Sequence, residues 1–106
     1  MNEMKEKLRA FNEERDWEQF HSPENLAKSV AIEAGELLEC FQWSGEYDRH
    51  KVADEIADVV MYCIMLADKI DIDIKEEMLR KLSENEAKYP VDLSKGSSKK
   101  YTELGE

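Results

Sequence analysis

The sequence predicts an all-α protein, and three observations support this fold class. Only four Gly and two Pro occur in 106 residues, which weighs against a β fold with many turns. Strong helix formers, mainly Glu, Lys, Leu, Ala, Met and Arg, dominate the chain. Apolar residues recur at helical spacing in separate segments. Together these observations predict four helices.

The first two predicted helices occupy the N-terminal part of the chain. The first covers about residues 2 to 19 and carries its apolar residues at helical spacing. The second runs from about residue 23 to residue 43. Ser22 is a suitable N-cap, and Pro23 suits the first helical position. A Ser-Gly pair follows residue 43, so we expect the second helix to stop there.

The third helix is predicted over about residues 49 to 70. The fourth is expected to start after Asp73, where Glu76 completes a sequence resembling a capping box. It should end near Tyr89, because a proline follows and disfavours helical backbone in the residue before it.

The predicted domain organisation is one helical domain over residues 1–90, followed by a tail over residues 91–106. The tail is rich in Ser, Lys and Gly and has few periodic apolar residues. We expect it to be flexible, with one short ordered contact at most.

The charge balance limits the classes of partner. A net charge of −10 weighs against binding to nucleic acid polymers or to anionic membranes. An anionic ligand would need local neutralisation, for which a divalent cation is a candidate. Cys40 and Cys63 lie in apolar helical patterns without a CxxC pair, which favours free buried thiols. The N-terminus has no apolar signal region, and no apolar run approaches membrane-spanning length, so we expect a cytoplasmic protein.

Two pairs of acidic residues lie beside the apolar faces of the second and third predicted helices. On a helical wheel, Glu33 falls at the edge of the apolar stripe and Glu36 just beyond it. Glu55 and Asp58 lie along the equivalent margin of the next helix. A single pair of this kind usually faces solvent, but two pairs on neighbouring helices are less expected. Carboxylates brought together at low dielectric bind protons or a cation.

The ligand chemistry of these acids favours a hard cation. Oxygen-only, anionic ligands suit Mg²⁺ or Mn²⁺ rather than zinc, and they indicate metal-assisted attack on a phosphate ester or anhydride. A ferritin-like di-iron bundle is the alternative, and it needs a Glu-x-x-His pair on each of two helices. The only histidines are His21 and His50, and the sequence does not supply two such pairs. The di-iron interpretation is therefore disfavoured.

At these residues the sequence resembles the all-α MazG-like nucleotide pyrophosphohydrolases. The family pattern is Glu-x-x-Glu, a spacer, then Glu-x-x-Asp; here Glu33-Ala-Gly-Glu36 is followed after eighteen residues by Glu55-Ile-Ala-Asp58. The flanking segments are similar as well, particularly to the dCTP-pyrophosphatase branch: ERDWEQFHSPENL, LLECFQW, DEIADVVMY and KLSENEAKYP. The resemblance covers about residues 8 to 90.

The resemblance implies a four-helix MazG-like bundle assembled through a homodimer or a homotetramer formed as a dimer of dimers. It implies hydrolysis of a nucleoside triphosphate to the monophosphate and pyrophosphate, with Mg²⁺ as cofactor and Mn²⁺ as a possible substitute. We expect a house-cleaning role on deoxynucleoside triphosphates, with dCTP or a modified pyrimidine first. Related enzymes acting on dUTP or phosphoribosyl-ATP remain open, as does a non-catalytic acidic helical protein that binds a nucleotide or a protein partner.

The resemblance also assigns site residues. Those expected to hold the metal are Glu33, Glu36, Glu55 and Asp58. Glu33 or Glu36 would also orient or deprotonate the attacking water. Residues expected around the substrate are Trp17, His21, Trp43, Tyr62, Lys81, Asn85 and Lys88. The alternative is packing or a structural contact for the first four and ordinary solvated charge for the lysines. Base and sugar preference, the number of metal ions and the role of residues 91–106 stay open.

Overall fold

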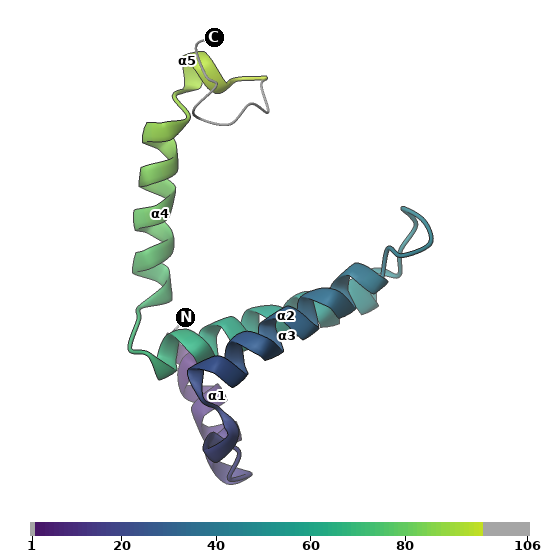
Figure 1. The fold of residues 1–106 in the computed structure, drawn as a ribbon, viewed down its shortest axis with the longest axis vertical. Coiled ribbons are helices and arrows are strands. Elements are labelled where there is room, and N and C mark those ends of the chain that lie inside the picture. The colour runs from purple at the N-terminus through teal and green to yellow at the C-terminus, as the bar shows by residue number, and fades with distance from the viewer. Residues whose placement is uncertain (1, 97–106) are drawn as a thin grey trace. The chain divides into compact units, whose positions relative to one another are not determined.

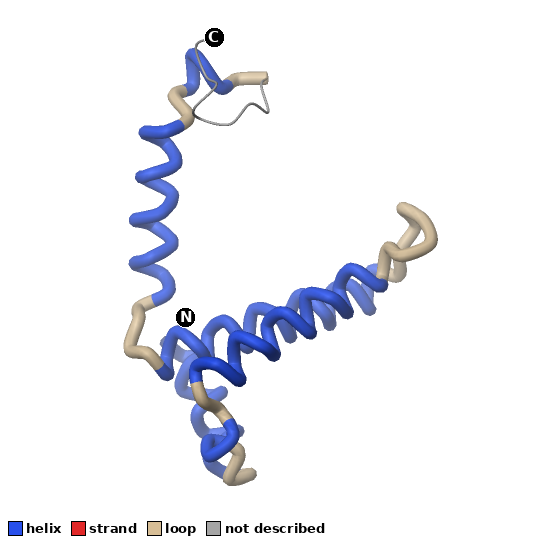
Figure 2. Tube along the Cα trace, viewed as in Figure 1, coloured by secondary structure: helices blue, strands red, loops and turns tan. Residues whose placement is uncertain are grey.

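The computed structural model describes residues 2–96, which form helices joined by short connections and contain no strand (Figures 1 and 2). The all-α prediction is therefore confirmed. In chain order the elements are α1 (Asn2–Glu14), the 3₁₀ turn η1 (Glu18–Phe20), α2 (Pro23–Glu39), α3 (Arg49–Lys69), α4 (Ile74–Lys88) and the single turn α5 (Val91–Ser94). None of the helices in this described part is both long and apolar enough to span a bilayer.

The chain divides into two units, each of which is described by itself. The first ends at Asp73 and holds α1, η1, α2 and α3, and the second begins at Ile74 with α4 and α5. The predicted tail over residues 91–106 thus begins with the helical turn α5, while residues 97–106 lie outside the described part. The division proposed from the sequence at residue 90 stays a prediction.

The first helix ends earlier than predicted, and a local backbone motif explains why. The chain turns at Asp16, whose φ of 55° is left-handed, so α1 stops at Glu14 instead of continuing to about residue 19. The amide of Trp17 donates to the carbonyl of Asn12 at 2.9 Å, as in a Schellman motif. The rings of Phe11 and Trp17 meet edge to face, with centroids 5.6 Å apart. This contact is the apolar pair that accompanies such a helix end.

The second helix begins as the sequence predicts. Ser22 Oγ accepts a hydrogen bond from the amide of Asn25 at 3.1 Å, and Pro23 occupies the first helical position. The regular helix ends at Glu39, short of the predicted residue 43. Three consecutive amides, those of residues 40–42, donate to carbonyls three residues earlier. The last turn is therefore tightened rather than lost, which is common at helix ends.

The third helix packs antiparallel to the second, and the pair forms a long hairpin (Figure 1). Asp48 caps α3 by accepting hydrogen bonds from the amides of His50 and Lys51 at 2.9 and 3.2 Å. The helix runs to Lys69, within a residue of the predicted end. It closes at Asp71, which has a φ of 59°, with the same type of motif that ends α1.

The buried core of the first unit is small and lies where α1 meets the hairpin. Its members are Leu8, Asn12, Leu26, Ile64 and Ala67. Beside it, Arg9 Nε on α1 donates to Asp68 Oδ2 on α3 at 2.7 Å, and a second nitrogen of the same guanidinium reaches the other carboxylate oxygen. Such two-point pairs fix the orientation of the joined elements.

Within the first unit, α1 leaves much of the apolar surface of the hairpin uncovered. On α2, Ile32 and Leu38 are 62% and 72% exposed, and on α3, Ile56 and Val60 are exposed as well. The apolar stripes predicted from periodicity are therefore only partly covered by α1.

Candidate active site

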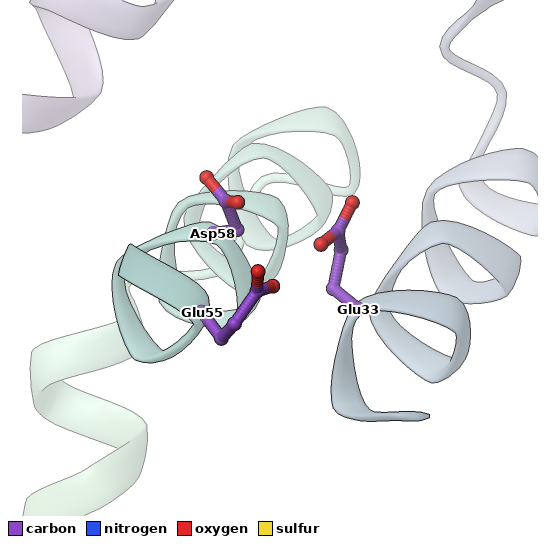
Figure 3. A group of neighbouring side chains, drawn as sticks. All are labelled: Glu33, Glu55 and Asp58. Carbon is purple, nitrogen blue, oxygen red and sulfur yellow. The ribbon is translucent and has the colours of Figure 1, made fainter. Parts of the chain in front are cut away.

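Three of the four predicted acids converge between α2 and α3 (Figure 3). Glu33 extends from α2 toward Glu55 and Asp58 of α3, and each residue offers one carboxylate oxygen, all within 4.8 Å of one another. All three side chains are half-buried. The spacing of three places the two α3 acids on one side of that helix, and the close packing of the hairpin brings Glu33 opposite them.

Glu36, the fourth acid, lies one turn beyond Glu33 on α2 and is exposed. It is close enough to raise the pKa of both Glu33 and Glu55. The four predicted acids therefore form one cluster, which we call the acidic cluster. Within it, Glu33 Oε2 and Glu55 Oε2 are both shielded from solvent, and neither has a hydrogen-bond partner.

Two members of the cluster, Glu33 and Glu55, have a proton affinity above the ordinary range of carboxylates. Burial, followed by the neighbouring Glu36, raises the pKa of Glu33 from 4.5 to about 7. Burial is also the first cause of the raised pKa of Glu55, again followed by Glu36. Near neutral pH the protein alone thus holds Glu33 partly protonated, because its ionised form is desolvated and repelled by its acidic neighbours. A cation bound among them would remove that repulsion.

An aromatic cavity of about 300 Å³ lies beside the acidic cluster. Trp17, His21 and Tyr62, three of the predicted substrate residues, all line it, and so does Asp58 of the cluster. The motif that ends α1 places Trp17 on this wall. Because a nucleobase is flat and stacks on aromatic faces, the cavity has the chemistry to hold one next to the carboxylates.

A second hollow, an open acidic groove of about 950 Å³, borders the cluster from the side of the α2–α3 loop. Glu36 and Glu55 line it together with Glu39 and Asp54, and Lys51 is the basic residue on its wall. The acidic cluster therefore shares Asp58 with the aromatic cavity and shares Glu36 and Glu55 with the groove.

The remaining predicted substrate residues are Trp43 in the first unit and three residues of the second unit. Trp43 is 89% exposed in the stretch after α2, and it does not line that cavity. Lys81, Asn85 and Lys88 belong to α4 in the second unit. There both lysines approach Glu84 Oε1, at 3.4 and 3.2 Å.

Five residues that line the cavity were not identified from the sequence as site residues: Leu8, Phe11, Asn12, Met61 and Met65. Phe11 is one of the apolar residues that recur at helical spacing in the first predicted helix, and this pattern gives no reason to place it beside a ligand. A sequence signal for Asn12 was its position four residues after Leu8, which places a polar side chain on the apolar face of the helix.

Comparison with known proteins identifies similar sequences. The MazG-like family profile matches residues 28–104. Mouse dCTP pyrophosphatase 1 is 39% identical over 104 residues, which cover 89% of this chain and 61% of the relative. The human protein of the same name is 41% identical over the same shares of each chain. This chain thus spans less than two thirds of the length of these relatives.

A solved structure gives a similar result at the level of the fold. The crystal structure of a pyrophosphatase from Archaeoglobus fulgidus DSM 4304 superposes with a TM-score of 0.79 at 41% sequence identity. The alignment covers 85% of this chain and 92% of the archaeal chain.

Proposed function

The chain belongs to the MazG-like family, and we propose that it is a metal-dependent nucleotide pyrophosphohydrolase that converts a nucleoside triphosphate to the monophosphate and pyrophosphate. The observation that carries this proposal is the convergence of Glu33, Glu55 and Asp58 from two helices, with oxygens within 4.8 Å of one another. The similarity to dCTP pyrophosphatases and to an archaeal pyrophosphatase supports it.

The acidic cluster fits a hard divalent cation. Two of its buried oxygens, Glu33 Oε2 and Glu55 Oε2, lack hydrogen-bond partners and are free to coordinate. Oxygen donors with several negative charges suit Mg²⁺, with Mn²⁺ as a substitute. We propose that Glu33, Glu36, Glu55 and Asp58 hold it. When bound, the cation would supply positive charge against the phosphate chain and lower the pKa of a water molecule.

The chain's own carboxylates would handle the proton of the reaction. Water oxygen attacks the α-phosphorus, the bond from that phosphorus to the bridging oxygen breaks, and pyrophosphate leaves with the bonding electrons. The proton released by the water passes to a carboxylate, and we assign this role to Glu33 or Glu36. Glu33 lies half-buried among the converging oxygens, while Glu36 is exposed and faces the open groove, so both are within the region where the water would be held.

Each of the two hollows beside the cluster would hold a different part of the substrate. We propose that Trp17, His21 and Tyr62 surround the base in the aromatic cavity, because this cavity shares Asp58 with the cluster. The phosphates would then lie over the cluster toward the acidic groove. The family resemblance keeps four further residues in the proposal. Trp43 would form another wall for the base. The α4 residues that would contact the triphosphate or the sugar are Lys81, Asn85 and Lys88.

The proposed substrate is a deoxynucleoside triphosphate removed in a house-cleaning role, with dCTP or a modified pyrimidine first. The dCTP pyrophosphatases among the similar proteins favour this choice. A family member acting on dUTP or phosphoribosyl-ATP is the nearest alternative. A non-catalytic nucleotide-binding module is disfavoured by the presence of all four acids.

We further propose that the protein works as a homodimer or homotetramer. The exposed apolar residues of α2 and α3, such as Ile32, Leu38 and Ile56, support this, because one α-helix covers too little of the hairpin. Analytical ultracentrifugation should show a dimer or tetramer at micromolar concentration. A stable monomer would contradict this part of the proposal.

The activity is tested by measuring pyrophosphate release from a panel of nucleoside and deoxynucleoside triphosphates and from phosphoribosyl-ATP. We expect release with Mg²⁺, release with Mn²⁺, and none with excess EDTA. A preference for dCTP would support the first substrate choice, and a preference for dUTP or phosphoribosyl-ATP would support the alternative. If no nucleotide yields metal-dependent pyrophosphate, the enzyme proposal fails and the binding-module interpretation gains support.

A further inference from the structure

Asn12 is a buried polar side chain in the wall of the aromatic cavity. It is 5% exposed, and its Oδ1 is shielded from solvent without any hydrogen-bond partner. Its Nδ2 donates to Met65 Sδ at 3.6 Å, and a thioether is a weak acceptor. The carbonyl oxygen of the side chain therefore has no hydrogen bond, and the hydrogen bond made by its nitrogen is weak.

Such an arrangement is costly for folding. A buried amide oxygen without a partner forfeits its hydration, and an apolar residue of similar size would avoid that loss. Its neighbours in the wall include Leu8, Phe11 and Met65, which would accept an apolar residue. A costly polar group that the fold does not use is a candidate for binding a ligand.

Asn12 also contacts Trp17, one of the aromatic residues of the cavity wall, through its backbone. Its backbone carbonyl accepts the amide of Trp17 at 2.9 Å, so the residue whose side chain borders the cavity also fixes one of its aromatic walls. A partial turn of the side-chain amide brings the oxygen toward the cavity without movement of α1. The contact of Nδ2 with Met65 Sδ, although weak, occupies the nitrogen and favours the orientation in which the oxygen is presented to a ligand.

We propose that Asn12 determines base specificity, with its Oδ1 accepting a hydrogen bond from the exocyclic amino group of a cytosine held in the aromatic cavity. This inference rests on the proposed function and deepens it. Uracil and thymine carry a carbonyl oxygen where cytosine carries the amino group, so they would place a second acceptor against Oδ1. A cavity of about 300 Å³ lies at the small end of ligand sites, which suits a single-ring base.

The test is the ratio of kcat/KM for dCTP to that for dUTP in the wild-type protein and in Asn12→Leu. We expect the wild type to prefer dCTP. The variant should lower the ratio by about tenfold or more, mainly through a lower kcat/KM for dCTP, because one buried hydrogen bond to the base is lost. Asn12→Ala, which removes the acceptor without adding bulk, should lower the ratio in the same direction.

Thermal unfolding separates this role from a structural one. If Oδ1 serves only the ligand, Asn12→Leu should melt no lower than the wild type without nucleotide, because the substitution removes an unsatisfied buried oxygen. The matched control is Asn25→Ala. In the wild type, Asn25 Nδ2 donates to the carbonyl of Phe20 at 3.0 Å, and Asn25 does not line the cavity. This control should leave the dCTP to dUTP ratio unchanged.

The outcomes separate this inference from the proposed function. If the wild type releases pyrophosphate from no nucleotide, the proposed function fails. If the wild type hydrolyses nucleotides but does not prefer dCTP over dUTP, or if both Asn12 variants keep the full preference, then the role of Asn12 is overturned and the activity stands.

Discussion

Asp58 and Asp68 are aspartates on the same helix, and their surroundings are opposite. Asp68 faces Arg9, and this guanidinium lowers the pKa of its carboxyl group. Asp58 faces Glu33 and Glu55, whose own pKa values are raised by burial and by their acidic neighbours. One carboxylate therefore joins α1 to α3 through an opposite charge, while the other lies among like charges.

The contact of Asp68 with Arg9 favours folding, whereas the contact of Asp58 with other acids disfavours it. An ion pair made by two hydrogen bonds helps to hold the helices together. A cluster of like charges at a helix–helix contact costs stability unless it is neutralised. Desolvated, mutually repelling titratable groups are characteristic of functional sites. The predictions below test this division, beginning with the largest expected effect.

Removing charge from the acidic cluster should abolish turnover while preserving the fold. We expect Glu36→Gln and Asp58→Asn each to lower pyrophosphate release by at least about a hundredfold, because each removes a negative charge from the proposed metal site. The helical circular dichroism should match that of the wild type. Asp68→Asn on the same helix is the matched control and should keep most of its activity. Near-normal rates in both cluster variants would refute the site assignment.

Breaking the Arg9–Asp68 pair should lower stability and leave most of the activity intact, the reverse of the effect expected for the cluster variants. Asp68→Asn should lower the melting temperature by several degrees, since it leaves the guanidinium without its charged partner. The loss should be present throughout the neutral range, because the lowered pKa of Asp68 keeps it ionised until the pH falls below its ordinary value of 3.8. A variant that melts with the wild type would show that the pair contributes nothing to stability.

The metal-free protein should become less stable as the pH rises through the titration of Glu33. Its pKa is 4.5 in the unfolded chain and about 7 in the folded protein, so the folded state binds more protons between these values. The free energy of unfolding therefore falls as pH rises from about 4.5 to about 7 and levels off above that. Melting curves measured in EDTA should show this trend, and Glu33→Gln should flatten it.

Addition of Mg²⁺ provides a check on the same group. The cation should raise the melting temperature more at pH 8 than at pH 5, since protons compete with it for the cluster at the lower pH. An equal effect at both values would argue against binding at the acidic cluster.

The smallest effect is expected for an exposed pair of ordinary charges. Lys7 and Glu3 approach to 3.1 Å on α1, and both side chains are mostly exposed. Glu3→Gln should leave both the melting temperature and the activity unchanged within error, because exposed pairs of this kind contribute little. A loss comparable to that of Asp68→Asn would mean that α1 depends on its surface charges generally.

Local sequence rules predicted most of the helices. The cap of Ser22, the proline after Tyr89 and the apolar periodicity act within a few residues, so each can be recognised without the fold. The early end of α1 was missed because the turn uses Asp16 in a left-handed conformation that glycine more often adopts. Nothing in the sequence marks this aspartate as a helix terminator.

The sequence by itself predicted the acidic cluster and the metal chemistry proposed for it. Two acid pairs at a spacing of three must each share a side of a helix, and the family resemblance linked them to a metal and a phosphate anhydride. Only the tertiary structure decided which groups border these acids. Burial and proximity across the α2–α3 contact raise the pKa of Glu33, and the end of α1 places Trp17 and Asn12 in one cavity. Both depend on contacts between segments distant in the sequence, which local periodicity does not encode.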